Sequence, residues 1–375
     1  MLISYKLRLI TSSIGWGGLE RNLLVMAQWM AKAGHEVTYA AVEGSPSWEH
    51  APCFGVTPEA IPHHPRRATV LDVRRWKHLA READLVWIRA PRDLDVASRA
   101  CRQTGTPLLV QQAMQISKPK TLWWHKRRYR AVGTWVSGLQ SLRTEALENT
   151  PLQAPQTYVL PLPLAPRWFD TRRMEAQTAR RNLGLALPDG VKLVGTVGRL
   201  DPGKGQRDAL RALAELPNHI HWLFVGGNTV NNGVDEATHL KHLAIELGVN
   251  DRVHWQAGRD DVLPVYDALD AFAMTSHAET IGTVTLEAMA RRVPVVGSLA
   301  GGTKELLAGG RGIGFESHND RDLARAIHDV LEMDTDATAQ MCDLALSHAL
   351  KSHPDALIPA WNDLLRQTIQ SARTT

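Results

Sequence analysis

KLVGTVGRLDPGKGQRDALRALAELPNHIHWLFVGG, residues 192–227, is the stretch that decides the fold. Residues 192–197 predict a strand, and residues 206–216 carry apolar side chains at the spacing of a helix. A glycine-bearing loop, residues 198–205, joins the two, and residues 219–225 predict a second strand that ends at two glycines. This order of strand, loop, helix and strand is typical of a parallel sheet with helical crossovers.

The same plan occurs at the start of the chain. Residues 7–11 predict a strand, and the turn after it contains Gly15, Gly17 and Gly18. A helical pattern follows from Leu19 to Met30, and residues 36–42 predict the next strand. We therefore expect an α/β protein with two Rossmann-like parallel-sheet lobes and a cleft between them.

Length and prolines divide the chain. With roughly 150 residues per domain, 375 residues predict two domains. Prolines at positions 151, 155, 161, 163 and 166 indicate the connector, because proline lacks a backbone donor and disfavours helix. We expect a first lobe at residues 1–163 and a second at residues 167–353, with further helical patterns at 321–332, 336–350 and 356–371.

Composition excludes several classes of protein. The three cysteines have no metal-ligand spacing, and their odd number argues against a disulfide framework. No stretch approaches the roughly 18 uninterrupted apolar residues that a membrane-spanning helix needs. We expect a cytoplasmic protein, with peripheral attachment to the inner face of the membrane as an open alternative.

Charge is distributed unequally between the two halves. Residues 1–165 contain 21 Lys and Arg against 12 Asp and Glu, a net charge of +9, whereas the rest contain 22 against 27, a net charge of −5. Such an asymmetry predicts an anionic partner for the first half, which could be a phosphorylated acceptor, a membrane surface or a nucleic acid.

The loop at residues 198–205 has a phosphate-binding character. Its spacing G-x-x-x-x-G-K matches a P-loop, but the Ser or Thr that ligates magnesium is replaced by Gly205. Arg199 and Lys204 still place two cations beside a predicted helix N-terminus, where anions are favoured. A solvated basic loop is the alternative interpretation.

A second loop carries paired carboxylates. Glu279 precedes a predicted helix, and Glu287 lies within it, one turn after Thr283. One carboxylate could accept hydrogen bonds from sugar hydroxyls and the other from a ribose diol, while the free amides of Thr280, Ile281, Gly282 and Thr283 could meet a diphosphate. The alternative is a helix with one exposed and one capping glutamate.

These motifs together resemble the retaining glycosyltransferases of family 4, which have the GT-B fold and act in lipopolysaccharide, glycolipid and polysaccharide synthesis. The resemblance rests on residues 17–20, 34–37, 198–205, 279–287 and 301–305. It implies that Arg199, Lys204 and Glu279 are catalytic, that Glu287 binds the donor ribose, and that Gly17 and Gly18 approach the phosphate. It also implies that residues 355–375 pack back on the first lobe, and that the anomeric configuration is retained.

Donor chemistry of this kind needs no cofactor or metal, because fixed cations and amides can stabilise a departing diphosphate. The nucleotide sugar is itself a substrate. Two D-x-D strings, residues 93–95 and 334–336, are predicted to be surface carboxylates.

The acceptor side departs from the family pattern. Many members have a histidine after the strand at residues 107–110, where this chain has Gln111, Gln112 and Gln115. We assign Glu20, Gln112 and Gln115 to the acceptor side. Residues 118–130 contain six cations and three aromatic residues, which predicts contact with an anionic membrane or a phosphorylated glycolipid. A helix with a basic solvent face and buried tryptophans is the alternative.

The predicted reaction is transfer of a sugar from a nucleotide-diphosphate sugar to a glycolipid or glycan acceptor, and no nucleic acid is expected as a partner. A nucleotide-sugar epimerase on the same fold, a P-loop nucleotide hydrolase and a non-catalytic nucleotide-sugar-binding protein are the alternatives. The base, the sugar, the acceptor linkage and the oligomeric state do not follow from the sequence.

Overall fold

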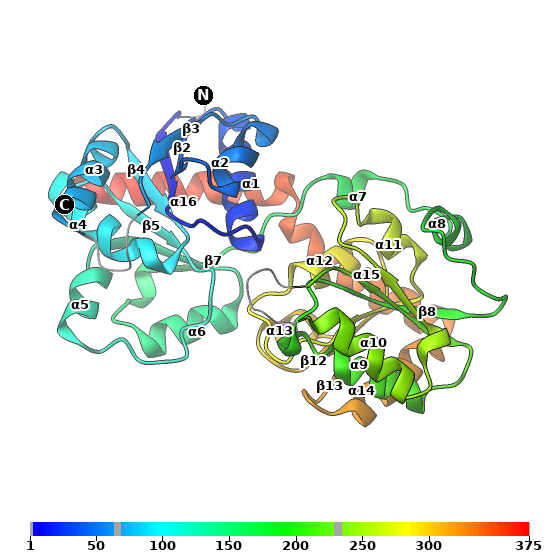
Figure 1. The fold of residues 1–375 in the computed structure, drawn as a ribbon. Helices are drawn as coiled ribbons and strands as arrows, with labels where there is room; N and C mark the ends of the chain where they lie inside the picture. Colours follow the sequence, from blue (N-terminus) through cyan, green and yellow to red (C-terminus); the bar gives the residue numbers. More distant parts are fainter. Residues whose placement is uncertain (1–2, 64–68, 229–234, 375) are drawn as a thin grey trace. The chain divides into compact units, whose positions relative to one another are not determined.

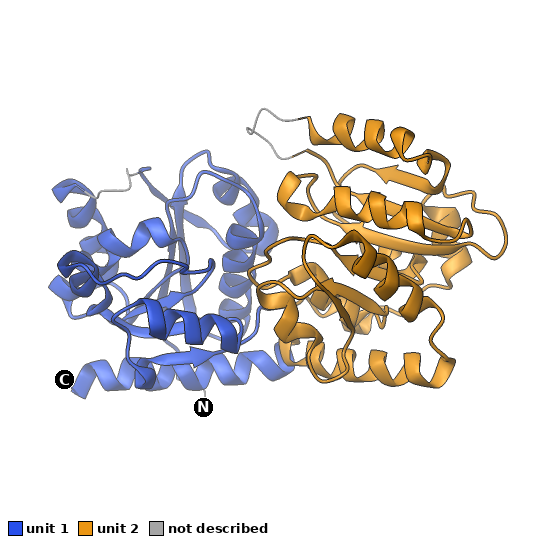
Figure 2. Ribbon diagram, turned by 90° about the horizontal axis from the view of Figure 1, so that it is seen from below, with its two compact units in different colours: residues 1–163, 354–375 blue, residues 164–353 orange. Residues whose placement is uncertain are grey.

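The computed structural model describes residues 3–63, 69–228 and 235–374. The chain forms two compact units (Figure 2), unit 1 from residues 1–163 and 354–375 and unit 2 from residues 164–353. Each unit is built around one parallel sheet. Among the described residues, no helix is long and apolar enough to cross a membrane.

Unit 1 contains a seven-stranded sheet with the order β3-β2-β1-β4-β5-β6-β7, and all its paired strands are parallel (Figure 1). Its strands are β1 (Lys6–Thr11), β2 (Glu36–Val42), β3 (Pro58–Ile61), β4 (Leu85–Ile88), β5 (Leu108–Gln111), β6 (Val132–Ser137) and β7 (Thr157–Val159). Its helices are α1 (Gly18–Lys32), α2 (Pro46–His50), α3 (Val70–Arg81), α4 (Leu94–Thr104), α5 (Trp123–Tyr129), α6 (Gln140–Asn149) and α16 (Pro354–Thr374), with 3-10 turns η1 (Ala51–Phe54), η2 (Pro91–Asp93) and η3 (Ala154–Gln156).

The two faces of this sheet bury separate cores. Leu85 and Trp87 of β4 belong to one hydrophobic cluster, whereas Val86 and Ile88 belong to another. Successive side chains of a strand point to opposite faces, so an uninterrupted apolar strand must be covered on both sides. Helix α16 supplies part of the first core, where the Trp361 ring stacks on Trp87 with 4.4 Å between ring centroids.

Unit 2 contains a six-stranded parallel sheet with the order β10-β9-β8-β11-β12-β13. Its strands are β8 (Lys192–Val197), β9 (Ile220–Val225), β10 (Val253–Gln256), β11 (Ala271–Met274), β12 (Val295–Ser298) and β13 (Ile313–Phe315). Its helices are α7 (Arg167–Asp170), α8 (Ala176–Asn182), α9 (Gln206–Glu215), α10 (Glu236–Glu246), α11 (Leu263–Ala268), α12 (Thr283–Ala290), α13 (Gly302–Leu307), α14 (Asp320–Leu331) and α15 (Thr335–Ala349), with η4 (Pro202–Lys204), η5 (Asn250–Arg252) and η6 (Leu350–Ser352).

The loop between β8 and α9 packs against the end of β11. Gly205 has a φ of 69°, and a Cβ atom there would lie 2.0 Å from the backbone oxygen of Thr275. Only glycine fits this position, because both the left-handed backbone and the close contact exclude a side chain. The absence of a P-loop Ser or Thr at this position therefore has a packing reason.

Two Rossmann-like parallel sheets were predicted from the sequence, and this prediction is confirmed. One interpretation was wrong in part. The proline-rich stretch is not only a connector, because Thr157–Val159 within it forms β7, which pairs with β6 at the edge of the sheet. Proline is tolerated around an edge strand, where fewer backbone donors are needed.

Replacing Trp361 with Ala is expected to lower the free energy of unfolding of unit 1 by about 3–5 kcal/mol, because it empties a fully buried aromatic site. Urea denaturation followed by far-UV circular dichroism measures this. Trp123→Ala is the control, because Trp123 is 69% exposed and should change the stability by less than about 0.5 kcal/mol. Equal effects of the two variants would contradict the assignment of α16 to the core of unit 1.

Gly205→Ala is expected to destabilise unit 2 by about 2 kcal/mol or more, because the new Cβ atom would collide with the Thr275 carbonyl. Gly203→Ala is the matched control in the same loop, since a Cβ there would meet only the Asp201 carboxylate at 3.4 Å. The midpoint of denaturation reports both effects. Equal stability of the two variants would refute the packing argument.

Candidate active site

Two neighbouring strands of unit 2 carry the candidate site. Strand β8 is followed by the loop at residues 198–205, and β11 is followed by the loop at residues 275–282. The two strands pair directly in the sheet. Both loops therefore emerge side by side at the carboxyl edge of a parallel sheet, which is where open α/β sheets bind ligands.

Lys204 and Glu279 meet across these loops. The Lys204 Nζ atom lies 2.8 Å from the Glu279 Oε2 atom, and the two side chains are 31% and 19% exposed. Both groups are thus held against each other but remain open on one side. A half-buried ammonium and carboxylate in contact can bind an anion and a hydroxyl group next to each other.

Backbone contacts fix the two loops to each other. The Thr275 hydroxyl donates to the Lys204 carbonyl at 2.7 Å, and the His277 amide donates to the Gly203 carbonyl at 3.0 Å. Sequence reasoning missed Thr275 and His277, because their role depends on the pairing of β8 with β11. The lysine and the glutamate are therefore presented by one rigid double loop.

Glu287 is held by a residue that sequence reasoning also missed. The phenol of Tyr266 donates to the Glu287 Oε2 atom at 2.9 Å, and its oxygen also lies 3.2 Å from the Val284 carbonyl oxygen. Burial, with the nearby Glu287 charge, raises the pKa of Tyr266 well above its usual range, so the phenol stays protonated and keeps donating. Tyr266 thereby orients one oxygen of this carboxylate.

The start of α12 has the predicted turn. Gly282 adopts a φ of 82° immediately before Thr283, the first helical residue. Ile281 is buried, whereas Thr280 and Thr283 are half-buried. The first amides of a helix have no acceptor within the helix, so they can bind an anionic oxygen.

Arg199 lies on the surface of the same loop. Its backbone carbonyl accepts a hydrogen bond from the Gln206 side chain at 2.9 Å, which anchors the loop to α9. The guanidinium is exposed and makes no ion pair with a residue that the structure describes. Arg199 is therefore available to a ligand, but no protein contact directs it toward Lys204 or Glu279.

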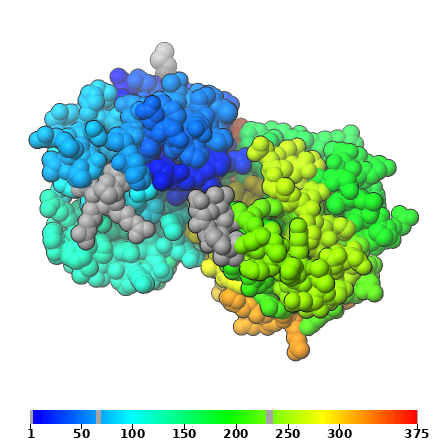
Figure 3. All heavy atoms as spheres, in the orientation of Figure 1, coloured from blue at the N-terminus to red at the C-terminus, as the bar shows by residue number. Residues whose placement is uncertain are grey.

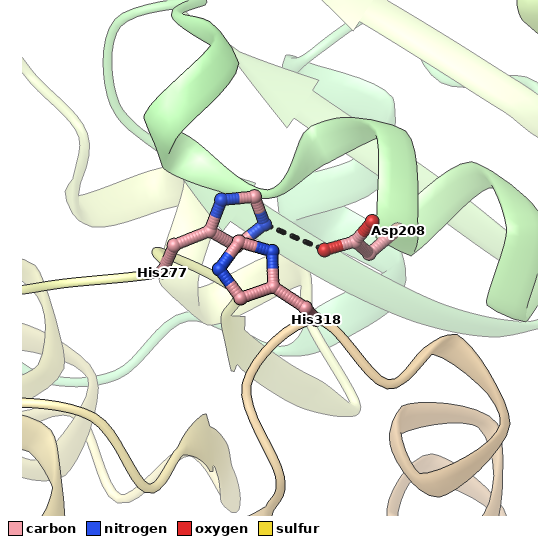
Figure 4. Close-up of side chains that lie close together, drawn as sticks. All are labelled: Asp208, His277 and His318. Atoms are coloured by element: carbon pink, nitrogen blue, oxygen red, sulfur yellow. Dashed lines mark hydrogen bonds and ion pairs between the residues drawn. The ribbon is translucent and has the colours of Figure 1, made fainter.

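Three side chains beside this double loop could hold a metal ion. Ligand atoms of Asp208, His277 and His318 all lie within 4.8 Å of one another (Figure 4). His277 Nε2 and Asp208 Oδ2 are 2.6 Å apart, and the His318 ring lies against that of His277 with 3.7 Å between centroids. Asp208 also contacts Arg211 at 3.3 Å, so its carboxylate has partners in the protein.

Three of the predicted residues of unit 1, Gly17, Gly18 and Glu20, lie around the start of α1. Gly17 has a φ of −175° and caps this helix, and a Cβ atom on Gly18 would meet nothing within 4 Å. The fold of unit 1 therefore does not require glycine at either position. Glu20 is buried and accepts a hydrogen bond from the Ser13 hydroxyl at 2.6 Å.

The two glutamines assigned to the acceptor side differ in their surroundings. The Gln112 carbonyl accepts from the Trp135 indole at 3.1 Å and from the Ser137 hydroxyl at 2.7 Å, while its amide donates to the Met114 carbonyl. Gln112 is thus mainly a buried structural group. Gln115 is exposed and lines a cavity of unit 1.

One surface prediction was wrong. Asp93 is fully buried and accepts hydrogen bonds from the amide and hydroxyl of Ser12, because it ties β1 to the turn before α4. Asp95 pairs with Arg128 at 2.8 Å. Asp334 and Asp336 are exposed as predicted, and Asp334 caps α15.

The basic and aromatic segment at residues 118–130 contains α5. Trp123 and Trp124 are 69% and 40% exposed, so the alternative of buried tryptophans is wrong. Lys126, Arg127 and Arg130 are also exposed. The turquoise atoms of this part of unit 1, around residues 115–150, are on the visible surface in Figure 3.

Residues 182–343 match the model of the family described as glycosyl transferases group 1. The chain is 35% identical over 209 residues to a D-inositol 3-phosphate glycosyltransferase of Stackebrandtia nassauensis. That match covers 52% of this chain and 46% of the relative, so the chain spans about half the length of this curated relative.

Solved structures match both units. HepE of Anabaena in complex with UDP superposes with a TM-score of 0.84 at 24% identity, covering 98% of this chain and 99% of that one. A glycosyltransferase from Rickettsia africae gives a TM-score of 0.86 at 16% identity, covering 98% and 99%. At such identities the likeness establishes the fold, which is the GT-B arrangement of two Rossmann-like units. The family match is confined to residues 182–343, which lie within unit 2 and contain the joined loops after β8 and β11.

Proposed function

We propose that this protein transfers a sugar from a nucleoside diphosphate sugar to an acceptor hydroxyl, as a glycosyltransferase. The observation that carries this proposal is the contact between Lys204 and Glu279 on the joined loops after β8 and β11. A cation beside a carboxylate matches a ligand in which a diphosphate is bonded directly to a polyhydroxylated ring. The names of two similar proteins, a glycosyltransferase and a UDP complex, support the same chemistry.

Each group has a role in the proposed reaction. Lys204 and Arg199 offset the charge that builds up on the departing diphosphate, and amides at the start of α12 add further donors. Glu279 accepts hydrogen bonds from hydroxyls of the transferred sugar, while Glu287, oriented by Tyr266, accepts them from the ribose. Gly17 and Gly18 leave the start of α1 open to a phosphate oxygen. Two cations and free amides make a metal unnecessary in this scheme, and we expect retention at the anomeric carbon.

The proposed acceptor is a glycolipid or glycan of the cell envelope. The relative from Stackebrandtia is named for a phosphorylated polyol acceptor. The net charge of +9 in residues 1–165 suits an acceptor that carries negative charge. An epimerase on the same fold would consume donor without any acceptor, and a non-catalytic sensor would bind donor without turnover.

Lys204→Ala and Glu279→Gln are each expected to lower kcat/KM at least ~100-fold, because each removes a charge that acts on the leaving group or the transferred sugar. The donor is first chosen by thermal stabilisation with UDP, GDP, ADP and their sugars. Release of nucleoside diphosphate is then measured with and without a glycolipid acceptor fraction. Lys241→Ala, an exposed cation of α10, is the matched control and should retain full activity.

Wild-type turnover in either site variant would refute the assignment of Lys204 and Glu279. Formation of an epimeric sugar without acceptor would favour the epimerase, and donor binding without turnover would favour the sensor. The same assay is repeated in EDTA. Loss of activity that added Mg²⁺ or Zn²⁺ restores would contradict the metal-independent part of the proposal.

We also infer that unit 1 attaches to an anionic membrane through α5. Trp123 and Trp124 are exposed beside Lys126 and Arg127, and aromatic rings with basic side chains favour the headgroup region of an anionic bilayer. Each basic side chain near such a surface contributes about 1 kcal/mol. A glycolipid acceptor would be presented at the same surface.

Lys126→Ala with Arg127→Ala is expected to reduce flotation with vesicles that contain phosphatidylglycerol, because two membrane-facing charges are lost. Arg74→Ala with Arg75→Ala removes the same charge from the exposed side of α3 and is the matched control. Equal flotation with neutral and anionic vesicles, or equal loss in both double variants, would refute docking through α5.

A further inference from the structure

A cavity of about 370 Å³ opens in unit 1 at the carboxyl edge of its sheet. Arg89 lines it directly after β4, and Gln112 lines it directly after β5. The remaining walls come from residues 113–118 and Lys120, from three residues of α5, and from four further side chains, Pro91, Leu94, Val110 and Trp135. A volume of this size lies within the range of pockets that bind small molecules. Its position at the strand ends is the place where parallel α/β sheets hold their ligands.

Arg89 is the feature of this cavity that the fold does not explain. Its side chain is 3% exposed, and its Nε and Nη1 atoms have no hydrogen-bond partner in the described part of the chain. Burial lowers the pKa of Arg89 to about 10, and the charge of Glu20 opposes this shift only in part. A buried guanidinium without hydrogen bonds is costly, so a group that supplies two acceptor oxygens would relieve it.

The other walls show which charge the cavity accepts. Lys118 and Lys120 also line it, and neither ammonium forms an ion pair with a described residue. Arg128 contributes a third wall cation, but Asp95 already holds it at 2.8 Å. No Asp or Glu is among the described residues that line it. The cavity is therefore cationic, with the buried guanidinium of Arg89, the exposed Lys118 and the half-buried Lys120 in its walls.

Gln112 gives the cavity a fixed wall. Its carbonyl and amide bind Trp135, Ser137 and the Met114 backbone, which leaves little freedom for its side chain. The Arg89 fork is therefore next to a surface that is rigid before any ligand arrives. Preorganisation of this kind lowers the entropy lost on binding.

We infer that this cavity binds the anionic group of a sugar-sized acceptor, a phosphate monoester or a carboxylate, with Arg89 as its bidentate ligand. The statement that the ligand is an acceptor rests on the proposed function, whereas the anion-binding site itself does not depend on that function. A pair of oxygens bound side-on to a guanidinium accepts from Nε and Nη2, and a pair bound end-on accepts from Nη1 and Nη2, so either mode would give one of the two unpartnered nitrogens an acceptor. Lys118 and Lys120 would neutralise the remaining charge.

Arg89→Gln tests this inference by binding rather than by turnover. Isothermal titration calorimetry with glucose 6-phosphate, glucuronate, glucose, inorganic phosphate and UDP is carried out on the full chain. Wild type is expected to bind glucose 6-phosphate or glucuronate, and the variant about ten- to a hundredfold more weakly, since hydrogen bonds to a charged group are lost. Arg102→Gln, an exposed cation of α4, is the matched control and should bind like wild type.

Each outcome bears on the inference. Equal affinity of wild type and Arg89→Gln for both anionic sugars would overturn it, as would equal binding of uncharged glucose. Inorganic phosphate binding as tightly as the anionic sugars would overturn the acceptor assignment and leave a free-anion site. If Arg89→Gln does not fold by circular dichroism, Lys118→Gln with Lys120→Gln replaces it, with weaker binding expected. If the wild-type protein does not bind UDP in the same titration, that result would count against the proposed function in unit 2 alone.

Discussion

The close approach of the loops after β8 and β11 is the constraint on which the candidate site depends. Gly205 makes room for the Thr275 carbonyl, and the Thr275 hydroxyl in turn holds the Lys204 carbonyl. Because β8 and β11 are neighbours in the sheet, this contact brings Lys204 to Glu279 across 75 residues of sequence. The ion pair is then a consequence of backbone packing, and its open side is left for a ligand.

In both units the candidate ligand-binding residues follow the carboxyl ends of parallel strands. In unit 2 the loops after β8 and β11 carry Lys204 and Glu279, and in unit 1 the ends of β4 and β5 carry Arg89 and Gln112. Parallel strands direct their carboxyl ends to one edge, where helix starts and loop amides accumulate partial positive charge. Two sheets of one design thus carry the proposed diphosphate site and the proposed anion cavity at the same kind of edge.

The residues that support the site differ in kind from those that form it. Tyr266 is buried in the core of unit 2 and contacts Glu287 through its hydroxyl, so an apolar environment keeps a polar donor in one place. Gln112 has the same role in unit 1 toward Trp135 and Ser137. Such partners fix side chains that would otherwise have several rotamers, and fixed groups stabilise developing charge without reorganisation.

The sequence by itself determined the architecture, because apolar runs of strand length alternating with helical periodicity allow little except parallel α/β sheets. It also predicted Arg199, Lys204, Glu279 and Glu287 as candidate site residues, since local motifs place charges at strand ends and helix starts. Tertiary structure alone decided that Lys204 contacts Glu279, that Asp93 is buried and that Gln112 is already hydrogen-bonded. It also decided that two nitrogen atoms of Arg89 have no hydrogen-bond partner among the described residues. These facts depend on which strands are neighbours and which side chains share a cavity, and pairing between distant segments leaves no periodic signal in the chain.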